Sequence, residues 1–281
     1  MQRFAATAAL ALFALVAGPV RAEDAGAAKG FLSHRAIYEL KLDDSSPRKQ
    51  ISAVQGRMVY EFLGSSCDGW TTQFRFVTQM LDADGGNARV TDLRTTTFED
   101  GEAKLFDFLN QSYVNQTVTD DSKGTARRDG KDVAIALERP GKKDLKIADG
   151  AMFPTQHLAR VIDKAKAGER VFEARVYDGS ETGERVFTAT AIIGSELTGA
   201  DKVGEETAAD VPVLASLRRW PVTVSYFDTK KKGGEDTPDY QISFVLYENG
   251  VTRKLTLDYG DLVISARMSK FEALPQSVCK P

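Results

Sequence analysis

The side chains that could do chemistry are few in this sequence, and its two cysteines are the first of them. Cys67 lies within the segment Gly64-Ser65-Ser66-Cys67-Asp68-Gly69-Trp70, and Cys279 is close to the C-terminal end. The pair lacks the Cys-x-x-Cys spacing that redox enzymes use at the start of a helix. In an exported chain an even number of cysteines predicts a structural disulfide, with two unpaired thiols as the alternative.

The two histidines, His34 and His157, are the next candidates for chemistry. Neither has a second ligand at a spacing typical of a metal site, and both are expected to make structural hydrogen bonds. No Gly-x-Ser-x-Gly segment precedes an expected helix, so the usual signature of a serine hydrolase is missing. We therefore expect a protein that is not an enzyme and that holds no metal and no cofactor. A hydrolase that uses His157 is the enzymatic alternative.

Charged residues form several short clusters, which we interpret as solvated surface. Residues 82–87 lack the ligand spacing of a calcium loop and are expected to form a hairpin turn. Arg218 and Arg219 are a candidate contact for anionic lipid or peptidoglycan, whereas the lysines at 230–232 are balanced by acidic neighbours. The net charge of −3 at pH 7 argues against a nucleic-acid partner.

Residues 1–22 have the pattern of a secretory signal peptide. A basic Arg3 precedes an apolar run over residues 4–16, and small residues follow up to Ala22, so cleavage is expected between Ala22 and Glu23. A membrane anchor is the alternative, but a spanning helix needs about 20 apolar residues and this run is shorter. The mature chain is therefore expected to be exported, with residues 23–30 as a disordered lead-in.

Most of the remaining chain alternates apolar and polar residues, which is the pattern of half-buried β-strands. Turns such as Asp129-Gly130 and Asn249-Gly250 favour antiparallel hairpins, because these dipeptides tolerate the positive φ angles of tight turns. The expected strands are residues 34–42, 53–63, 70–80, 88–98, a strand from about residue 103, 125–128, 131–138, 170–177, 185–197, 220–227, 240–248, 251–259 and 262–268.

One segment has helical periodicity instead. Residues 156–167 carry apolar side chains at intervals of three and four, with Thr155 expected to cap the N-terminus and Gly168 to follow the last turn. Residues 199–210 are polar and acidic and are expected to form a surface loop. A flat sheet of about fourteen strands is unusual. We therefore expect one mainly β domain, residues 31–281, in which a long antiparallel sheet curls and a short helix packs on it.

Six segments, taken in order, carry a family resemblance: Ser33-His34-Arg35-Ala36-Ile37-Tyr38-Glu39-Leu40, residues 64–70, Phe153-Pro154-Thr155-Gln156-His157, Val176-Tyr177-Asp178-Gly179, Arg219-Trp220-Pro221-Val222 and the run from 238 to 279. Together they resemble EipB-type periplasmic cell-envelope integrity proteins of α-proteobacteria, a family formerly classed only by a domain of unknown function. The resemblance implies a β-spiral or open barrel with a helix against it, a disulfide matching Cys67 and Cys279, and a role in maintaining the envelope. It implies no catalytic residues, and the spiral is similar to periplasmic carriers of lipoproteins or lipids.

A curled sheet has a concave face, which is the expected binding surface. Aromatic residues that alternate on the early strands are expected to line it and to hold an acyl chain or an apolar partner segment, with core packing as the alternative. The expected function is non-enzymatic support of the envelope through binding of envelope proteins or other envelope components; the alternative is a carrier or binding protein for lipid or lipoprotein acyl chains. We expect a periplasmic monomer, with peripheral membrane contact as an option. The candidate residues are Tyr38, Tyr60, Phe62, Trp70, Phe74 and Phe76.

Overall fold

A single antiparallel sheet of fourteen strands dominates the structure, a computed structural model that describes residues 30–43, 51–82, 88–229, 237–276 and 279. The expected signal peptide, most of the lead-in, the 82–87 turn beyond its first residue and the 230–232 lysines lie outside these residues. The strands are β1 His34–Leu42, β2 Ile51–Ser65, β3 Gly69–Asp82, β4 Ala88–Glu99, β5 Leu105–Val114, β6 Thr117–Asp129, β7 Asp132–Arg139, β8 Lys143–Ile147, β9 Val171–Val176, β10 Phe187–Ile193, β11 Arg219–Asp228, β12 Tyr240–Tyr247, β13 Thr252–Asp258 and β14 Val263–Ala273.

The first and last strands of the chain meet in the middle of this sheet. Strand β1 pairs with β2 on one side and with β14 on the other, so the strand order runs β8 to β1 and then β14 to β9. All neighbours in the sheet are antiparallel, as the hairpin turns predict. Each arm is thus a meander, and the chain passes from one arm to the other between β8 and β9, the two outermost strands.

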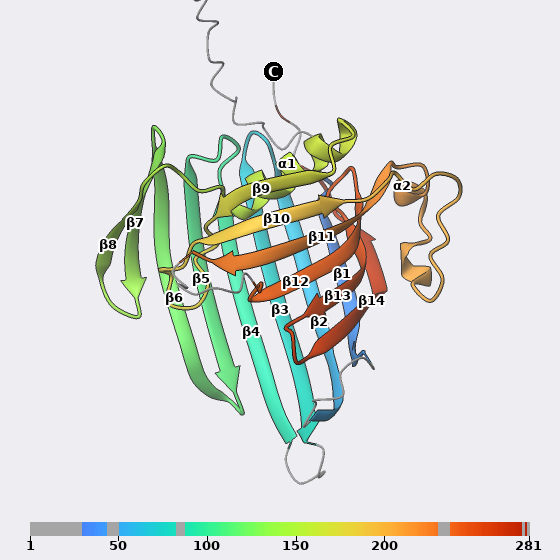
Figure 1. Ribbon diagram of the computed structural model, residues 1–281, viewed down its shortest axis with the longest axis horizontal. Coiled ribbons are helices and arrows are strands. Elements are labelled where there is room, and N and C mark those ends of the chain that lie inside the picture. Colours follow the sequence, from blue (N-terminus) through green and yellow to red (C-terminus); the bar gives the residue numbers. More distant parts are fainter. Residues whose placement is uncertain (1–29, 44–50, 83–87, 230–236, 277–278, 280–281) are drawn as a thin grey trace, which may run out of the picture.

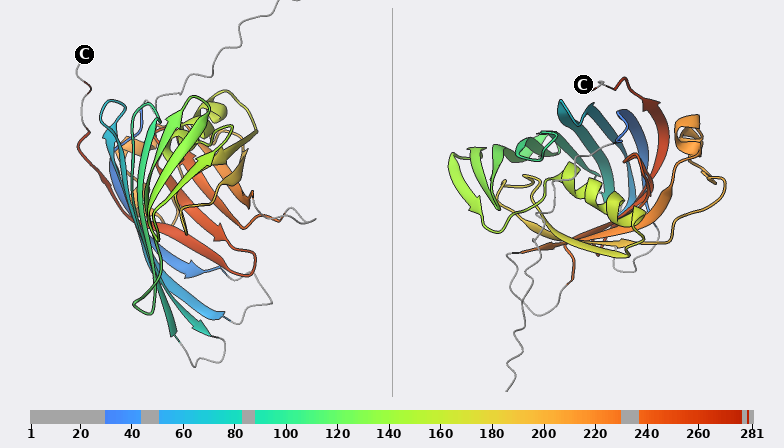
Figure 2. Two further views of the ribbon diagram at one scale, coloured as in Figure 1. Left: turned by 90° about the vertical axis from the view of Figure 1, so that its left-hand side faces the viewer. Right: turned by 90° about the horizontal axis from the view of Figure 1, so that it is seen from above.

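The sheet curls without closing. The long strands β2 to β4 form the back of the molecule, and β10 to β13 cross in front of them (Figure 1). Seen from above in Figure 2, the sheet wraps around helix α1, Pro154–Lys166, which lies inside the curve. Strands β8 and β9 do not pair. Instead, Met152 forms a parallel bridge beside β9: its backbone N–H donates to the Arg175 carbonyl at 2.7 Å, and its carbonyl accepts from the Tyr177 N–H at 2.9 Å.

Helix α1 fills one end of the curl. Its buried face, which includes Val161 and Ile162, packs into a core with Trp70, Trp220 and Leu246 from both arms of the sheet. Burying side chains of this size contributes roughly 1.5–3 kcal/mol each, so the helix links the two arms energetically.

The start of α1 differs from the expectation, and its end agrees with it. Thr155 is inside the helix and does not cap it; Phe153 is the N-cap residue and provides no side-chain hydrogen bond. Pro154 in the first helical position supplies the preset φ angle that starts the helix. Gly168 follows the last turn with a φ of 78°, a conformation that favours glycine.

Three elements were not expected from the sequence, and one strand begins earlier than expected. Strand β8 is short and mostly exposed, so it shows no clear alternation. Strand β6 begins at Thr117, earlier than residue 125, because its first residues are polar and exposed. The 199–210 segment contains a short 3-10 helix, Thr207–Ala209, and is followed by helix α2, Pro212–Ala215; the expectation of a single helix was therefore incomplete.

None of the helices in the described part of the chain has the length and apolar character needed to cross a membrane.

Candidate functional site

The interior of the curl contains a cavity of about 480 Å³, called the central cleft below. This volume lies within the range of about 300–1,000 Å³ that is typical of ligand sites in proteins. The cleft is lined by Tyr60, Phe62, Thr72, Phe74, Leu93, Thr95, Thr97, Asn110, Ser112, Asp120, Pro154, Thr155, Leu158, Asp178, Ser180, Glu181, Phe187, Tyr240, Ile242, Leu257 and Tyr259.

The two long walls of the central cleft differ in chemistry. Strands β3 and β4 form a wall that mixes hydroxyl groups with apolar side chains, because Thr72 is opposite Thr97 in the register and Phe74 is opposite Thr95. The facing wall, from β10, β12 and β13, is aromatic and aliphatic, and we call it the aromatic wall. Its members in the lining are Phe187, Tyr240, Ile242, Leu257 and Tyr259.

The rings of the aromatic wall are packed against one another. Tyr240 stacks on Tyr226 with ring centroids 4.6 Å apart, and it contacts Phe187 at 6.0 Å and Tyr259 at 6.1 Å. Burial raises the pKa of Tyr226 and of Tyr240, and the charge of Asp178 adds to this effect. Both phenols are therefore neutral near pH 7, and the wall presents an uncharged surface.

The charged groups of the central cleft are all acidic. Asp120, Asp178 and Glu181 line it, and no Lys, Arg or His is among its described lining residues. Burial raises the pKa of Asp178, opposed by the Ser180 N–H, which donates to Oδ1 at 2.9 Å. Burial also raises the pKa of Glu181, opposed by Arg185, whose Nε lies 2.8 Å away. The cleft thus combines an apolar wall with negative charge.

A smaller cavity of about 150 Å³, the inner pocket, adjoins the central cleft. The two share four lining residues: Pro154, Leu158, Asp178 and Tyr240.

His157 lines the inner pocket from helix α1. Its side chain is 6% exposed, and its Nε2 has no hydrogen-bond partner among the described residues. Burial lowers the pKa of His157 to about 4, and the ring lies 5.8 Å from that of Phe172. The neutral imidazole is therefore a polar group directed to no described partner.

Three of the six predicted aromatic residues line the central cleft, and three do not. Tyr60, Phe62 and Phe74 are in the lining. Tyr38 is buried in the core and donates to the Thr252 carbonyl at 2.7 Å, so it does not line the central cleft and core packing, the alternative for these residues, describes it. Trp70 and Phe76 are also core residues; Trp70, for example, stacks on Phe62 at 4.9 Å.

The aromatic wall and the acidic residues of the cleft were missed by sequence reasoning. The wall comes from strands far along the chain from the early aromatic strands, and only the curl brings the two sets together. A signal for Asp178 was present, because it belongs to the Val176-Tyr177-Asp178-Gly179 segment that carries the family resemblance. Alternation alone gives the face of a strand but not which distant strand it faces.

The predicted disulfide between Cys67 and Cys279 is present. The two Cα atoms are 5.7 Å apart, and both residues are exposed. Cys67 lies in the turn between β2 and β3, and Cys279 follows β14, so the bond ties the chain end to the early hairpin. It lies at the surface and does not line the central cleft.

His34 has a structural role, as expected. Its Nδ1 is 2.7 Å from the Leu32 carbonyl, its ring stacks on Phe271 at 5.7 Å, and burial lowers its pKa. Within the described ranges, no group of His, Cys, Asp and Glu side chains is arranged to hold a metal ion.

The Arg218–Arg219 pair is not a free basic patch. Arg218 bonds to Glu196 at 2.7 Å and covers the ring of Trp220 at 5.0 Å. Arg219 is buried, 3.4 Å from Asp201, and donates to the Gly199 carbonyl. Neither guanidinium is therefore available as an unpaired contact for anionic lipid.

The 199–210 segment also differs from the expected solvated loop. Its Asp201 and Glu206 side chains are buried and bind Arg253, and Tyr247 donates to Asp201. Glu206 also accepts from the backbone N–H of Lys254 and of Met268, both at 2.9 Å. The acidic residues that suggested a surface loop are the groups that dock it onto β13 and β14.

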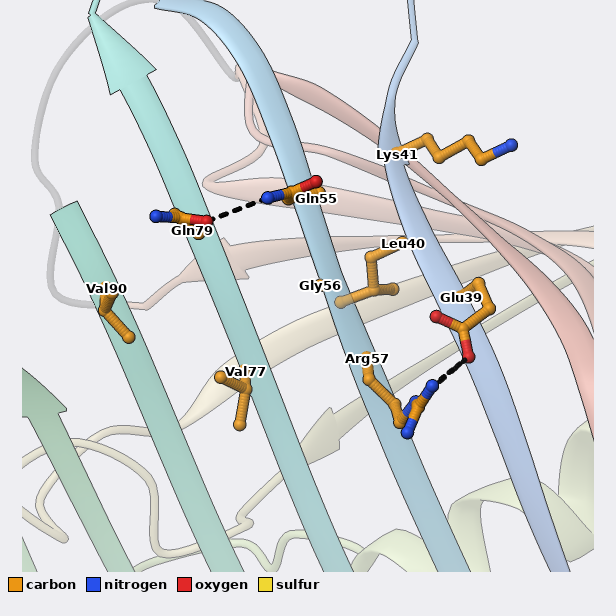
Figure 3. Close-up of a pocket in the computed structure, with 9 residues that line it drawn as sticks. All are labelled: Glu39, Leu40, Lys41, Gln55, Gly56, Arg57, Val77, Gln79 and Val90. Carbon is orange, nitrogen blue, oxygen red and sulfur yellow. Dashed lines mark hydrogen bonds and ion pairs between the residues drawn. The ribbon is translucent and has the colours of Figure 1, made fainter. Parts of the chain in front are cut away.

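A second hollow lies on the opposite face of strands β1 to β4 (Figure 3). It has a volume of about 650 Å³ and is open to solvent around Gly56. Four of the five polar side chains that line it are paired with each other: Glu39 with Arg57 at 2.8 Å, and Gln55 with Gln79 at 2.8 Å. Since these groups satisfy one another in an open hollow, the central cleft is the better candidate site.

Comparison with known proteins gives consistent matches over nearly the whole chain. A family model described as EipB-like matches residues 25–275. The chain is 40% identical over 271 residues to the cell envelope integrity protein EipB of Brucella abortus (strain 2308). The alignment covers 96% of this chain and 94% of that protein. It is also similar to the crystal structure of a β-barrel-like protein of domain of unknown function DUF1849 from Brucella abortus, with a TM-score of 0.78, 37% identity and coverage of 87% of this chain and 99% of that one.

Proposed function

The chain belongs to the EipB-like family, and from this premise we propose that it is a non-enzymatic periplasmic protein that supports cell-envelope integrity by binding an envelope component in the central cleft. The name of the Brucella relative supports the envelope role. The signal-peptide pattern of residues 1–22 supports export to the periplasm.

The observation that carries the binding proposal is the central cleft itself. A filled interior would be expected if the curled sheet were only a structural element, because protein cores are close-packed. Instead, a cavity of about 480 Å³ lies between the two arms of the sheet, with one apolar and one hydroxyl-bearing wall. An apolar pocket with a few polar groups directed into it is the usual form of a small-molecule site.

The second candidate function is transport of a lipid or a lipoprotein acyl chain. The aromatic wall favours it, because Ile242, Leu257 and the rings of Tyr240 and Tyr259 offer a continuous apolar surface. A carrier must release its ligand, and a sheet that does not close provides an exit without breaking strand pairs. Both candidates use the same cleft and differ in whether the ligand is passed on.

Support for a non-enzymatic role comes from the chemistry of the cleft. None of its described lining residues is a cysteine, lysine or histidine, so Asp120, Asp178 and Glu181 are the groups there that could act as acid or base, and His157 in the inner pocket has no described hydrogen-bond partner at Nε2. A catalytic base is normally oriented by a third group and lies near a nucleophile. Full complementation by a His157→Ala variant would exclude the hydrolase alternative.

Deletion of the gene tests the envelope role. The deletion strain is expected to be more sensitive than the parent to detergent and to cell-wall antibiotics, and the wild-type gene should restore resistance. Native mass spectrometry of the protein purified from the periplasm tests binding, with a bound small molecule as the expected result. Normal resistance of the deletion strain would refute the envelope role, whatever the cleft binds.

A further inference from the structure

We infer that the central cleft binds an amphiphile with a primary ammonium head and an apolar tail, the head in the inner pocket between Asp178 and His157 and the tail along the aromatic wall. This inference rests on the proposed function, because it names the class of ligand for the same cleft. It makes fatty acids and other anionic amphiphiles the disfavoured ligands.

The charge of the lining selects for a cation. Asp120, Asp178 and Glu181 line the cleft, and its described lining contains no cationic side chain to balance them. Arg185 pairs with Glu181 at 2.8 Å and also lies 3.7 Å from Asp228. Its described ion pairs are therefore with these two carboxylates and not with the cleft residues Asp120 and Asp178. A carboxylate in a confined cavity attracts a cation, and repels an anion, more strongly than it does in water.

The inner pocket supplies a carboxylate for the head group and, with the hydrogen of the neutral His157 ring assigned to Nδ1, an acceptor nitrogen as well. Asp178 and His157 both line this pocket of about 150 Å³. His157 is buried, with 6% of the residue exposed, and Nε2 has no partner in the part of the chain that the structure describes. Native structures rarely leave a buried nitrogen unbonded, and a ligand that donates a hydrogen bond satisfies it.

A primary ammonium fits these acceptors better than other cations do. It carries three N–H donors on one small nitrogen, enough for the Asp178 carboxylate and Nε2 of His157 together. Since His157 is neutral near pH 7, its ring does not repel the cation. The stacked rings of Tyr226 and Tyr240 line the same pocket, and aromatic rings stabilise a nearby cation.

The tail of the amphiphile follows from what adjoins the inner pocket. Tyr240 belongs to both cavities, so a chain leaving the pocket beside it enters the central cleft along the aromatic wall. Ile242, Leu257 and Tyr259 continue that wall. Covering them with an alkyl chain removes apolar surface from water on both sides of the contact.

Isothermal titration of the mature protein with three dodecyl amphiphiles, each below its micelle concentration, tests the inference. The probes are dodecylammonium, dodecyl maltoside and dodecanoate, which share a chain and differ in head-group charge. We expect dodecylammonium to bind at least about tenfold more tightly than dodecanoate, and its affinity to fall as salt is added. Dodecanoate binding as tightly as dodecylammonium would overturn the inference.

Matched variants locate the head group. Asp178→Asn is expected to weaken dodecylammonium binding about tenfold or more while leaving dodecyl maltoside binding nearly unchanged. Asp144→Asn makes the same substitution at an exposed position of β8 and should change neither. If thermal melting shows that Asp178→Asn does not fold, His157→Phe, which removes the other polar group of the inner pocket, replaces it. Unchanged dodecylammonium affinity in a folded Asp178→Asn or His157→Phe variant would contradict the inference.

The outcomes separate this inference from the proposed function. Equal affinity for all three probes would overturn the ammonium preference and leave the cleft as an apolar binding site. Binding of none of them would overturn the inference, while the deletion strain would still report on the envelope role independently.

Discussion

The carboxylate of Glu99, at the end of strand β4, lies at the N-terminus of helix α1 and accepts hydrogen bonds from the backbone N–H groups of Thr155 at 2.8 Å and Gln156 at 2.9 Å. A helix leaves its first N–H groups without intrahelical partners, and Glu99 serves as the cap that Phe153 does not provide. Because α1 forms one end of the central cleft, this contact positions part of the cleft lining.

Glu99 also predicts a pH dependence of stability. Burial raises its pKa to about 7 in the folded protein, against the helix N–H groups that favour the charged form. A carboxyl whose pKa is higher when folded binds more protons in the native state, so its contribution falls as the pH rises from about 4.5 to 7. As the pH rises over this window, the unfolding free energy of the wild type should fall by on the order of 3 kcal/mol relative to that of Glu99→Gln.

Urea unfolding of both proteins at the two ends of the window measures this effect. Groups common to wild type and Glu99→Gln cancel in the difference between them. A difference in unfolding free energy that stays constant with pH would show that the Glu99 pKa is not raised.

His157 predicts a dependence of opposite sign. Burial lowers the pKa of His157 to about 4. Between about pH 6.5 and pH 4 the imidazole is therefore protonated in the unfolded chain and neutral in the folded chain. Stability should therefore decline as the pH falls from about 6.5 to 4, by up to about 3 kcal/mol relative to His157→Phe. Unfolding curves at these two pH values, with His157→Phe as reference, check the sign, and parallel behaviour of the two proteins would contradict it.

Replacing Arg253, which holds the 199–210 segment, should lower the unfolding free energy more than replacing Arg57 does. Arg253 is buried and forms ion pairs with Asp201 and Glu206, so Arg253→Met removes the charged partner that both of these buried carboxylates share and should cost about 3–5 kcal/mol. Arg57→Met is the matched control, because Arg57 forms an exposed pair with Glu39 and should cost at most about 1 kcal/mol. Similar costs in chemical denaturation would mean that the segment is not held by Arg253.

Removal of the disulfide should lower stability. Joining Cys67 to Cys279 restricts the unfolded chain over most of its length, and such bonds typically contribute about 2–5 kcal/mol. The double Cys→Ser variant, compared with the oxidised wild type by thermal melting, should show a lower Tm. Reductant should lower the Tm of the wild type and leave that of the variant unchanged, and a wild-type Tm insensitive to reductant would contradict this.

Much of the architecture was predictable because strand alternation and hairpin turns are local signals. The bounds of β1 and the turns at Asp129-Gly130 and Asn249-Gly250 follow from a few neighbouring residues. Which faces meet was not predictable in the same way. Tyr38 and Tyr60 lie on the same face of paired strands, yet one is sealed in the core and the other lines the central cleft.

Buried charges were the other limit of sequence reasoning. Glu99, Asp201 and Glu206 are acidic residues that local composition places at the surface. Each is buried because a partner distant in sequence satisfies it: a helix N-terminus for Glu99, and Arg253 for the other two. Only the folded structure brings those partners into reach.

Complementation of the deletion strain by a cleft-filling variant tests the central claim most directly. Thr95 lines the central cleft from β4, and Thr96, its exposed neighbour, points to the opposite face because side chains alternate along a strand. We expect Thr95→Trp to fold, to fill the cleft and to fail to restore detergent resistance, whereas Thr96→Trp should restore it. Full resistance with a folded Thr95→Trp protein at wild-type abundance would contradict the claim that the central cleft carries the function.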